Sequence, residues 1–145
     1  MTRYYGIDEA NEALPEVDRI LAALRAQRVE LIELRDRVVA LTPEDDEAPS
    51  AGVAERIRLV RLGMQGLIDQ MQAGVARLVE LDVTLRDIST GLIDFPALVS
   101  GRPIWLCWRL GEGDVEYWHP HDEGFDSRRP LSELPMGRGS GTPAA

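Results

Sequence analysis

The chain has 145 residues, a formal net charge of −9 and a single Cys. This length suits one domain whose core folds without disulfides or a structural metal, so we predict no cofactor. The negative charge opposes the phosphate backbone of nucleic acid, and no long uncharged apolar segment is present, so we expect neither nucleic acid nor a membrane as a partner. A lone thiol without a signal segment predicts a cytoplasmic protein.

The N-terminal part predicts a short helix followed by a long one. Residues 7–13 are typical of one or two helical turns with acidic residues at the positive end, and Leu14-Pro15 is interpreted as a corner. From Pro15 onward, apolar residues recur in alternating steps of three and four, which is the spacing of a heptad seam. The seam consists of Val17, Ile20, Leu24, Leu31, Leu34, Val38 and Leu41, with the polar Gln27 in its middle.

A second seam predicts a second long helix antiparallel to the first. Its members are Val53, Ile57, Val60, Met64, Leu67, Met71, Gly74, Leu78 and Leu81. Residues 42–50 contain two prolines and four acidic residues, so they end one helix and precede the next as a solvated turn. Residues 15–82 are therefore predicted to form a helical hairpin.

Past Leu81 the pattern changes to the alternation of β-strands, so residues 83–131 are predicted to form a small antiparallel β-meander. A hairpin around 111–114 would place Leu110 opposite Val115 and Arg109 opposite Glu116, as a salt bridge that fixes the register. The same register pairs Trp108 with Tyr117, Cys107 with Trp118 and Leu106 with His119. The predicted fold class is α+β in one domain, 1–135, followed by a disordered tail, 136–145.

Several motifs together resemble a known bacterial family. They are Leu14-Pro-Glu-Val17, Gly91-Leu-Ile-Asp-Phe-Pro96, Leu106-Cys-Trp-Arg-Leu-Gly-Glu112, Tyr117-Trp-His119, Gly124-Phe125 and Arg128. In this order and spacing they are similar to the family called domain of unknown function 2203, over nearly the whole chain. The chain departs from the family pattern at Pro120-His121 and at Arg129. The family has no established activity, so the resemblance implies a fold and no reaction.

The candidate site residues lie between Gly91 and Leu131 and permit several interpretations. Asp94, Arg109, His119 and Arg128 would form a small-ligand or hydrolytic pocket if they converged. In that interpretation Arg109, Arg128 and Arg129 would bind a carboxylate or phosphate. His119 and His121 are the residues to consider for a metal, although the chain lacks an established zinc spacing. Asp94 before Phe95-Pro96 is typical of a turn cap, and Cys107 is interpreted as a small packed hydrophobe.

The two predicted helices carry more apolar surface than a hairpin can bury. Outside the seams, apolar residues widen one face of each helix, and a short meander at the open end cannot cover their full length. We therefore expect a homodimer in which two hairpins form a four-helix bundle. The expected interface residues are Leu21, Ile32, Val39, Ile68, Val75 and Val79. The preferred function is a noncatalytic oligomeric scaffold or interaction protein, with the ligand-binding or hydrolytic protein and the metal protein as alternatives.

Overall fold

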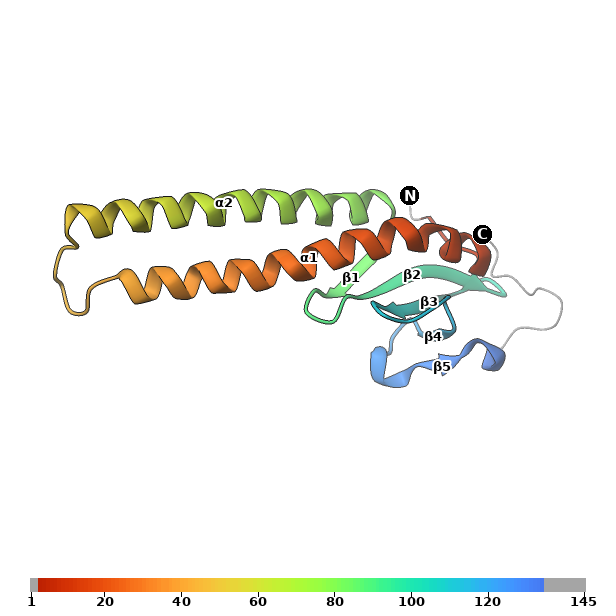
Figure 1. Cartoon of the computed structure of the whole chain (residues 1–145). Coiled ribbons are helices and arrows are strands. Elements are labelled where there is room, and N and C mark those ends of the chain that lie inside the picture. Colours follow the sequence, from red (N-terminus) through yellow and green to blue (C-terminus); the bar gives the residue numbers. More distant parts are fainter. Residues whose placement is uncertain (1–2, 135–145) are drawn as a thin grey trace.

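The computed structural model describes residues 3–134, in which two long antiparallel helices are followed by a five-stranded antiparallel sheet (Figure 1). This confirms the predicted α+β fold with a hairpin and a meander; the predicted tail, 136–145, lies outside the described residues. None of the helices described is both long and apolar enough to cross a membrane. The elements are α1 (Ile7–Leu41), α2 (Ala51–Glu80), β1 (Thr84–Asp87), β2 (Leu92–Val99), β3 (Arg102–Arg109), β4 (Tyr117–Pro120) and β5 (Arg129–Pro130), with short 3₁₀ turns at Phe125–Ser127 and Leu131–Glu133.

Helix α1 is continuous through Pro15, so the predicted corner at this residue is wrong. A proline inside a helix removes one backbone hydrogen bond, at a cost of about 3 kcal/mol. The buried stripe of α1 runs through this position without interruption, with Leu14 and Val17 on either side of it. Burial of this stripe against the rest of the core offsets the lost bond, and the helix therefore begins at Ile7.

The turn between the helices is built as the sequence indicates. Thr42 ends α1, and its hydroxyl donates to the Val38 carbonyl. Ser50 begins α2 by accepting a hydrogen bond from the Val53 backbone N–H, as an N-cap does. The two helices then pack along their seams, where Gln27 donates to Gln70 across the hairpin.

The core lies where the sheet meets the first half of α1 and the end of α2. The strands follow chain order, β1-β2-β3-β4-β5, and the face of the sheet toward the helices is apolar. Phe95, Leu106 and Trp118 form one row across β2, β3 and β4 on this face. Tyr5 packs edge-on against Phe95 at 4.9 Å between ring centroids. The core therefore ties both termini of the described chain to the sheet.

The register between β3 and β4 differs by one residue from the predicted one. Cys107 pairs with Tyr117 and Trp105 pairs with His119, so the predicted pair of Arg109 and Glu116 does not form. The cause is the connection 110–116, which is held by contacts that alternation does not encode. Glu112 accepts from the Arg109 backbone N–H, and Asn11 of α1 accepts from the Val115 backbone N–H.

A shift of one residue moves every side chain of a strand to the opposite face of the sheet. In the predicted register His119 shares a face with Leu106, which is the face covered by the helices. In the structure His119 lies on the outer face, together with Asp94 and Cys107. The register therefore decides which polar groups meet.

Candidate functional site

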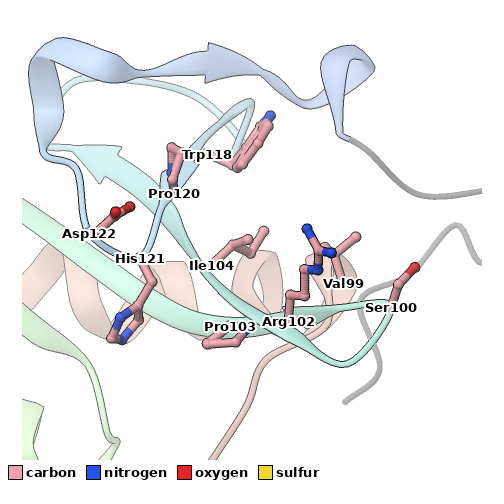
Figure 2. A pocket seen from close by; sticks show the side chains of 9 residues that line it. All are labelled: Val99, Ser100, Arg102, Pro103, Ile104, Trp118, Pro120, His121 and Asp122. Carbon is pink, nitrogen blue, oxygen red and sulfur yellow. The ribbon is translucent and has the colours of Figure 1, made fainter.

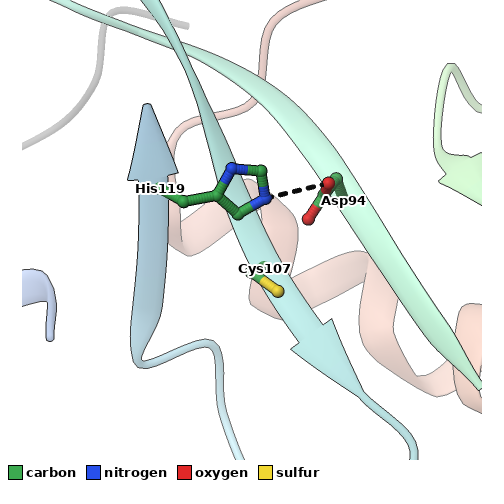
Figure 3. Close-up of side chains that lie close together, drawn as sticks. All are labelled: Asp94, Cys107 and His119. Atoms are coloured by element: carbon green, nitrogen blue, oxygen red, sulfur yellow. Dashed lines mark hydrogen bonds and ion pairs between the residues drawn. The ribbon is translucent and has the colours of Figure 1, made fainter. Parts of the chain in front are cut away.

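Three chemically capable side chains converge on the outer face of the sheet, one from each of β2, β3 and β4 (Figure 3). Asp94 stands directly opposite Cys107 in the register, and His119 reaches toward Asp94 from the next strand. All three residues are buried. One ligand atom from each, namely a carboxylate oxygen, the thiol sulfur and a ring nitrogen, lie within 4.8 Å of one another. We call these residues the Asp-Cys-His cluster.

Asp94 is the centre of the polar contacts in this cluster. Its Oδ2 lies 3.0 Å from Nε2 of His119 and accepts a 2.8 Å hydrogen bond from Nε of Arg86. The Cys107 thiol is a weak donor toward this carboxylate, and apart from it the buried Oδ1 has no hydrogen-bond partner. Because a buried carboxylate oxygen without a partner is costly, this atom indicates a position where another group belongs. The expectation that Asp94 caps a turn is wrong, because it lies inside β2.

Cys107 is a buried thiol whose surroundings oppose ionisation. Burial, and then the negative charge of Asp94, raise the pKa of the Cys107 thiol to about 12. A thiol with such a pKa stays protonated at neutral pH and is a poor nucleophile. The two nitrogens of His119 face Asp94 and the Pro120 carbonyl oxygen, so neither is directed to take the thiol proton. The arrangement is therefore not that of a Cys-His nucleophilic pair.

A cavity of about 310 Å³ opens over the cluster between the sheet and residues 121–125. Trp105 anchors this segment, since its Nε1 donates to the His121 carbonyl and its ring stacks on the His121 ring at 5.0 Å. The guanidinium of Arg86 also lies over the Trp105 ring, 4.8 Å from its centroid. The cavity is lined by Arg86, Leu92, Asp94, Cys107, His119, His121, Asp122, Glu123, Gly124 and Phe125.

The four predicted pocket residues do not all meet. Asp94 and His119 are in contact, whereas Arg109 is exposed and its guanidinium lies 5.2 Å from the ring centroid of Phe125. Arg128 is directed to Glu112, with a 2.6 Å salt bridge, and also lies over Phe125. Both guanidinium groups therefore lie over the Phe125 ring, and neither arginine lines the cavity over the cluster.

A larger cavity of about 690 Å³ lies beside the β2-β3 turn and the end of β4 (Figure 2). Its wall is mostly apolar and includes Ile104 and Trp118, and Arg102 is among the polar residues that line it. His121 and Asp122 line both cavities, and so form the partition between them. His121 thus lies beside the Asp-Cys-His cluster and is not one of its members.

Two residues of this site are absent from the sequence-based candidates. From its sequence position Cys107 is interpreted as a small packed hydrophobe, because no general base lies next to it. Its alternation with Trp105 and Arg109 nevertheless places it on the polar face once the register is known. Arg86 has no such signal, because it lies at an irregularity in the β1-β2 pairing, where alternation fails.

The fold and the site together define a class: an α+β protein in which a long helical hairpin covers one face of a meander and a buried Asp-Cys-His cluster occupies the other. The chain belongs to the family of uncharacterised conserved proteins DUF2203, whose model matches residues 3–131. No curated protein and no solved structure matches the chain. Family membership thus agrees with the resemblance in the motifs and assigns no activity.

Proposed function

We propose that the chain is a homodimeric scaffold, in which two hairpins combine into a four-helix coiled-coil bundle and carry one sheet with its site at each end. The observation that supports this most directly is the uncovered part of the hairpin, residues 25–70, which we call the arm. The rest of the described chain is the base. The sheet packs at the base, and the arm projects from it as two helices alone (Figure 1).

Burial changes sharply along α1. The residues of α1 that are buried run from Ala10 to Leu24, and none of those beyond Leu24 is buried. Large apolar side chains of the arm are in contact with water, among them Val39, which is 68% exposed, and Leu59, which is 55% exposed. Exposed apolar surface along a two-helix arm favours a partner that covers it.

The apolar stripe that α1 uses in the core continues into the arm. Leu21 is fully buried in the core of this chain, so it is removed from the expected interface. Ile32 and Val39 follow Leu21 at steps of eleven and seven residues, which are close to whole numbers of helical turns. The sheet covers this stripe at the base, and no described element covers it in the arm.

Helix α2 adds apolar surface in the arm and at the adjoining end of the base. Ile68 and Val75 line an apolar hollow of about 430 Å³ together with Leu31 of α1. Val79 follows Val75 by one turn and is 67% exposed. A partner seated in this hollow would bury apolar side chains of both helices.

A second copy of the chain is the partner that fits this face. Its own stripe is complementary because it is the same stripe, related by a twofold axis. Charges along the arm are mixed, as at Arg28, Glu33 and Arg35, so two arms do not repel each other over their length despite the overall negative charge. If the arms overlap antiparallel, both sheets remain outside the bundle. We also propose a cytoplasmic location, where a single reduced thiol is stable.

Sedimentation of the purified chain and of a Val39→Glu variant tests this proposal. We expect a wild-type dimer at micromolar concentration. The dissociation constant of the variant dimer should be at least about 100-fold higher, because an unpaired charge in a desolvated interface costs about 3 to 5 kcal/mol. Since Val39 is solvated in the single chain, the substitution should leave the fold of the protomer intact.

Leu59→Glu is the matched control, because Leu59 is similarly exposed. It precedes Ile68 by nine residues, about two and a half helical turns, and so lies on the opposite side of α2. This variant should remain dimeric. A monomeric wild type would overturn the proposal. Dissociation by Leu59→Glu without dissociation by Val39→Glu would overturn the proposed face.

A further inference from the structure

We propose that Asp94, Cys107 and His119 bind one transition-metal ion, preferentially Zn²⁺, with a fourth coordination position open to the cavity above them. The inference is independent of the dimer, because all three ligands belong to one sheet. It rests on the geometry of the three side chains, on the unpartnered carboxylate oxygen and on the chemistry of the donor set.

The spacing of the donors fits a tetrahedral ion. Zinc takes nitrogen, oxygen and sulfur ligands at about 2.0 to 2.3 Å, so neighbouring ligand atoms around it lie about 3.3 to 3.8 Å apart. The donor atoms of the cluster already lie within 4.8 Å of one another. Only small side-chain rotations would be needed, and strands supply more rigid positions than loops do.

His119 is oriented as a metal ligand. A ligating histidine usually donates its other ring N–H to a carbonyl or carboxylate, which fixes the nitrogen that faces the ion. Here Nδ1 lies 3.0 Å from the Pro120 carbonyl oxygen, so with an ion on Nε2 the ring proton would sit on Nδ1 and be donated to that carbonyl. The lone pair of Nε2 then faces the Asp94 carboxylate, within reach of an ion beside it.

Asp94 has one oxygen for the ion and one for its support. Oδ2 is held by Arg86 at 2.8 Å, which leaves the buried and unpartnered Oδ1 as the ligand atom. Without an ion, Oδ2 is satisfied by Arg86 and His119, and the carboxylate has only the weakly donating Cys107 thiol besides them, so Oδ1 stays without a strong partner. A bound cation satisfies both the carboxylate and the neighbouring sulfur, and this is why the cluster favours an ion over a simple polar pair.

The charges also balance. Binding of a divalent cation displaces the proton of the Cys107 thiol to solvent. The ion with the resulting thiolate, one carboxylate and a neutral imidazole is then neutral, as a buried site requires. The side chain of Arg86 is 40% exposed, so its charge is partly solvated at the edge of the site. Asp122 and Glu123 lie exposed at the cavity mouth, where carboxylates attract cations.

The donor set selects the class of metal. A mixture of sulfur, nitrogen and oxygen suits zinc and disfavours Mg²⁺ and Ca²⁺, which prefer oxygen alone. Three protein ligands and an open fourth position are typical of zinc sites that bind a water or another small ligand. The cavity of about 310 Å³ provides room for such a ligand next to the ion.

Titration of chelator-treated protein with Co²⁺, followed by displacement with Zn²⁺, tests this inference. We expect one ion per chain, visible absorption bands of tetrahedral cobalt and a sulfur-to-cobalt charge-transfer band in the near ultraviolet. Because Cys107 is the only cysteine of the chain, the charge-transfer band identifies it directly in the wild-type protein, even if a variant fails to fold. Elemental analysis of purified protein gives the natural occupant.

Cys107→Ser and Asp94→Asn should each lose Zn²⁺ affinity by about 100-fold or more, because changes even outside the ligand shell cost about 10- to 100-fold. His121→Ala is the matched control and should keep wild-type affinity, because His121 lines the cavity without belonging to the cluster. No stoichiometric cobalt binding, binding without the sulfur band, or loss of binding in His121→Ala would each overturn the inference.

Discussion

Helix α1 passes from the base into the arm with its heptad pattern unchanged, yet its surroundings change completely. At the base, Leu24 is 1% exposed and packs with Gly74 of α2 and the core below the sheet. In the arm, Leu34 belongs to the same seam and stays half-buried, against Gly63 of α2. The same spacing of leucines therefore yields a core in one region and a solvated seam in the other.

This difference teaches that heptad spacing fixes which faces of two helices meet, and that a third layer fixes how far they are buried. In the arm only Ile57 and Leu67 of α2 are buried between the two helices, and most other seam residues stay partly exposed, whereas the sheet closes one side of the hairpin at the base. Stability of the single chain is thus concentrated at the base. The arm depends on whatever covers it, so substitutions at the base and in the arm should differ in their effect on stability.

The largest expected effect is the contrast between Leu24→Ala and Leu34→Ala, measured by urea unfolding in the Val39→Glu background so that the arm stays solvated. Leu24→Ala should lower the free energy of unfolding by about 2 to 5 kcal/mol, because it empties a fully buried site. Leu34→Ala should lower it by about 1 kcal/mol, because the half-buried Leu34 side chain buries less apolar surface than that of Leu24. Equal losses would show that the arm is as well packed as the base.

The hairpin and the class of the fold were predictable because their signals are local and repeat many times. Two seams of alternating steps specify both helices, and the prolines of 42–50 separate them. Pro15 was misinterpreted because its local cost is visible in the sequence, whereas the burial of Leu14 and Val17 that offsets it is not. Tertiary packing overrides a local preference there.

The site was predictable only in part, because its assembly depends on the register. Asp94 and His119 are recognisable as candidates from their residue types alone. Their meeting with Cys107 requires the β3-β4 register, which Glu112 and Asn11 set through contacts that alternation does not reveal. Arg86 depends further on an irregular pairing between β1 and β2.

The contacts that set this register give the next largest effect. Glu112 is mostly buried, accepts from the Arg109 backbone N–H and pairs with Arg128 at 2.6 Å. Glu112→Gln should therefore lower the free energy of unfolding by about 1.5 to 3 kcal/mol, as loss of a charged hydrogen-bond partner does. Glu116 is exposed, so Glu116→Gln should leave stability unchanged. Thermal unfolding of both variants, compared with the wild-type chain, measures the two effects. A larger loss of stability in Glu116→Gln than in Glu112→Gln would instead support the register that pairs Arg109 with Glu116.

The smallest expected effect is a weakening of the base, and not of the arm, at alkaline pH. Burial and the charge of Asp94 raise the pKa of the Cys107 thiol to about 12 in the folded chain, from its ordinary value of 9.0. Above pH of about 9 the unfolded chain loses this proton and the folded chain keeps it, so the unfolded state is favoured as the pH rises. Between pH of about 8 and 10, in the presence of a chelator, the free energy of unfolding should fall by about 1.5 kcal/mol, given about 1.4 kcal/mol for each pH unit beyond the unfolded pKa.

Urea titrations at the two pH values measure this loss, and Cys107→Ser should remove most of it. Burial also raises the pKa of Tyr5, so a smaller part of the loss belongs to its hydroxyl, which donates to the Leu81 carbonyl at the base. Tyr5→Phe separates the two contributions. A loss that persists at full size in Cys107→Ser would mean that Cys107 ionises as readily in the folded chain as in the unfolded one. The thiol would then be far less shielded than its place beneath the segment 121–125 implies.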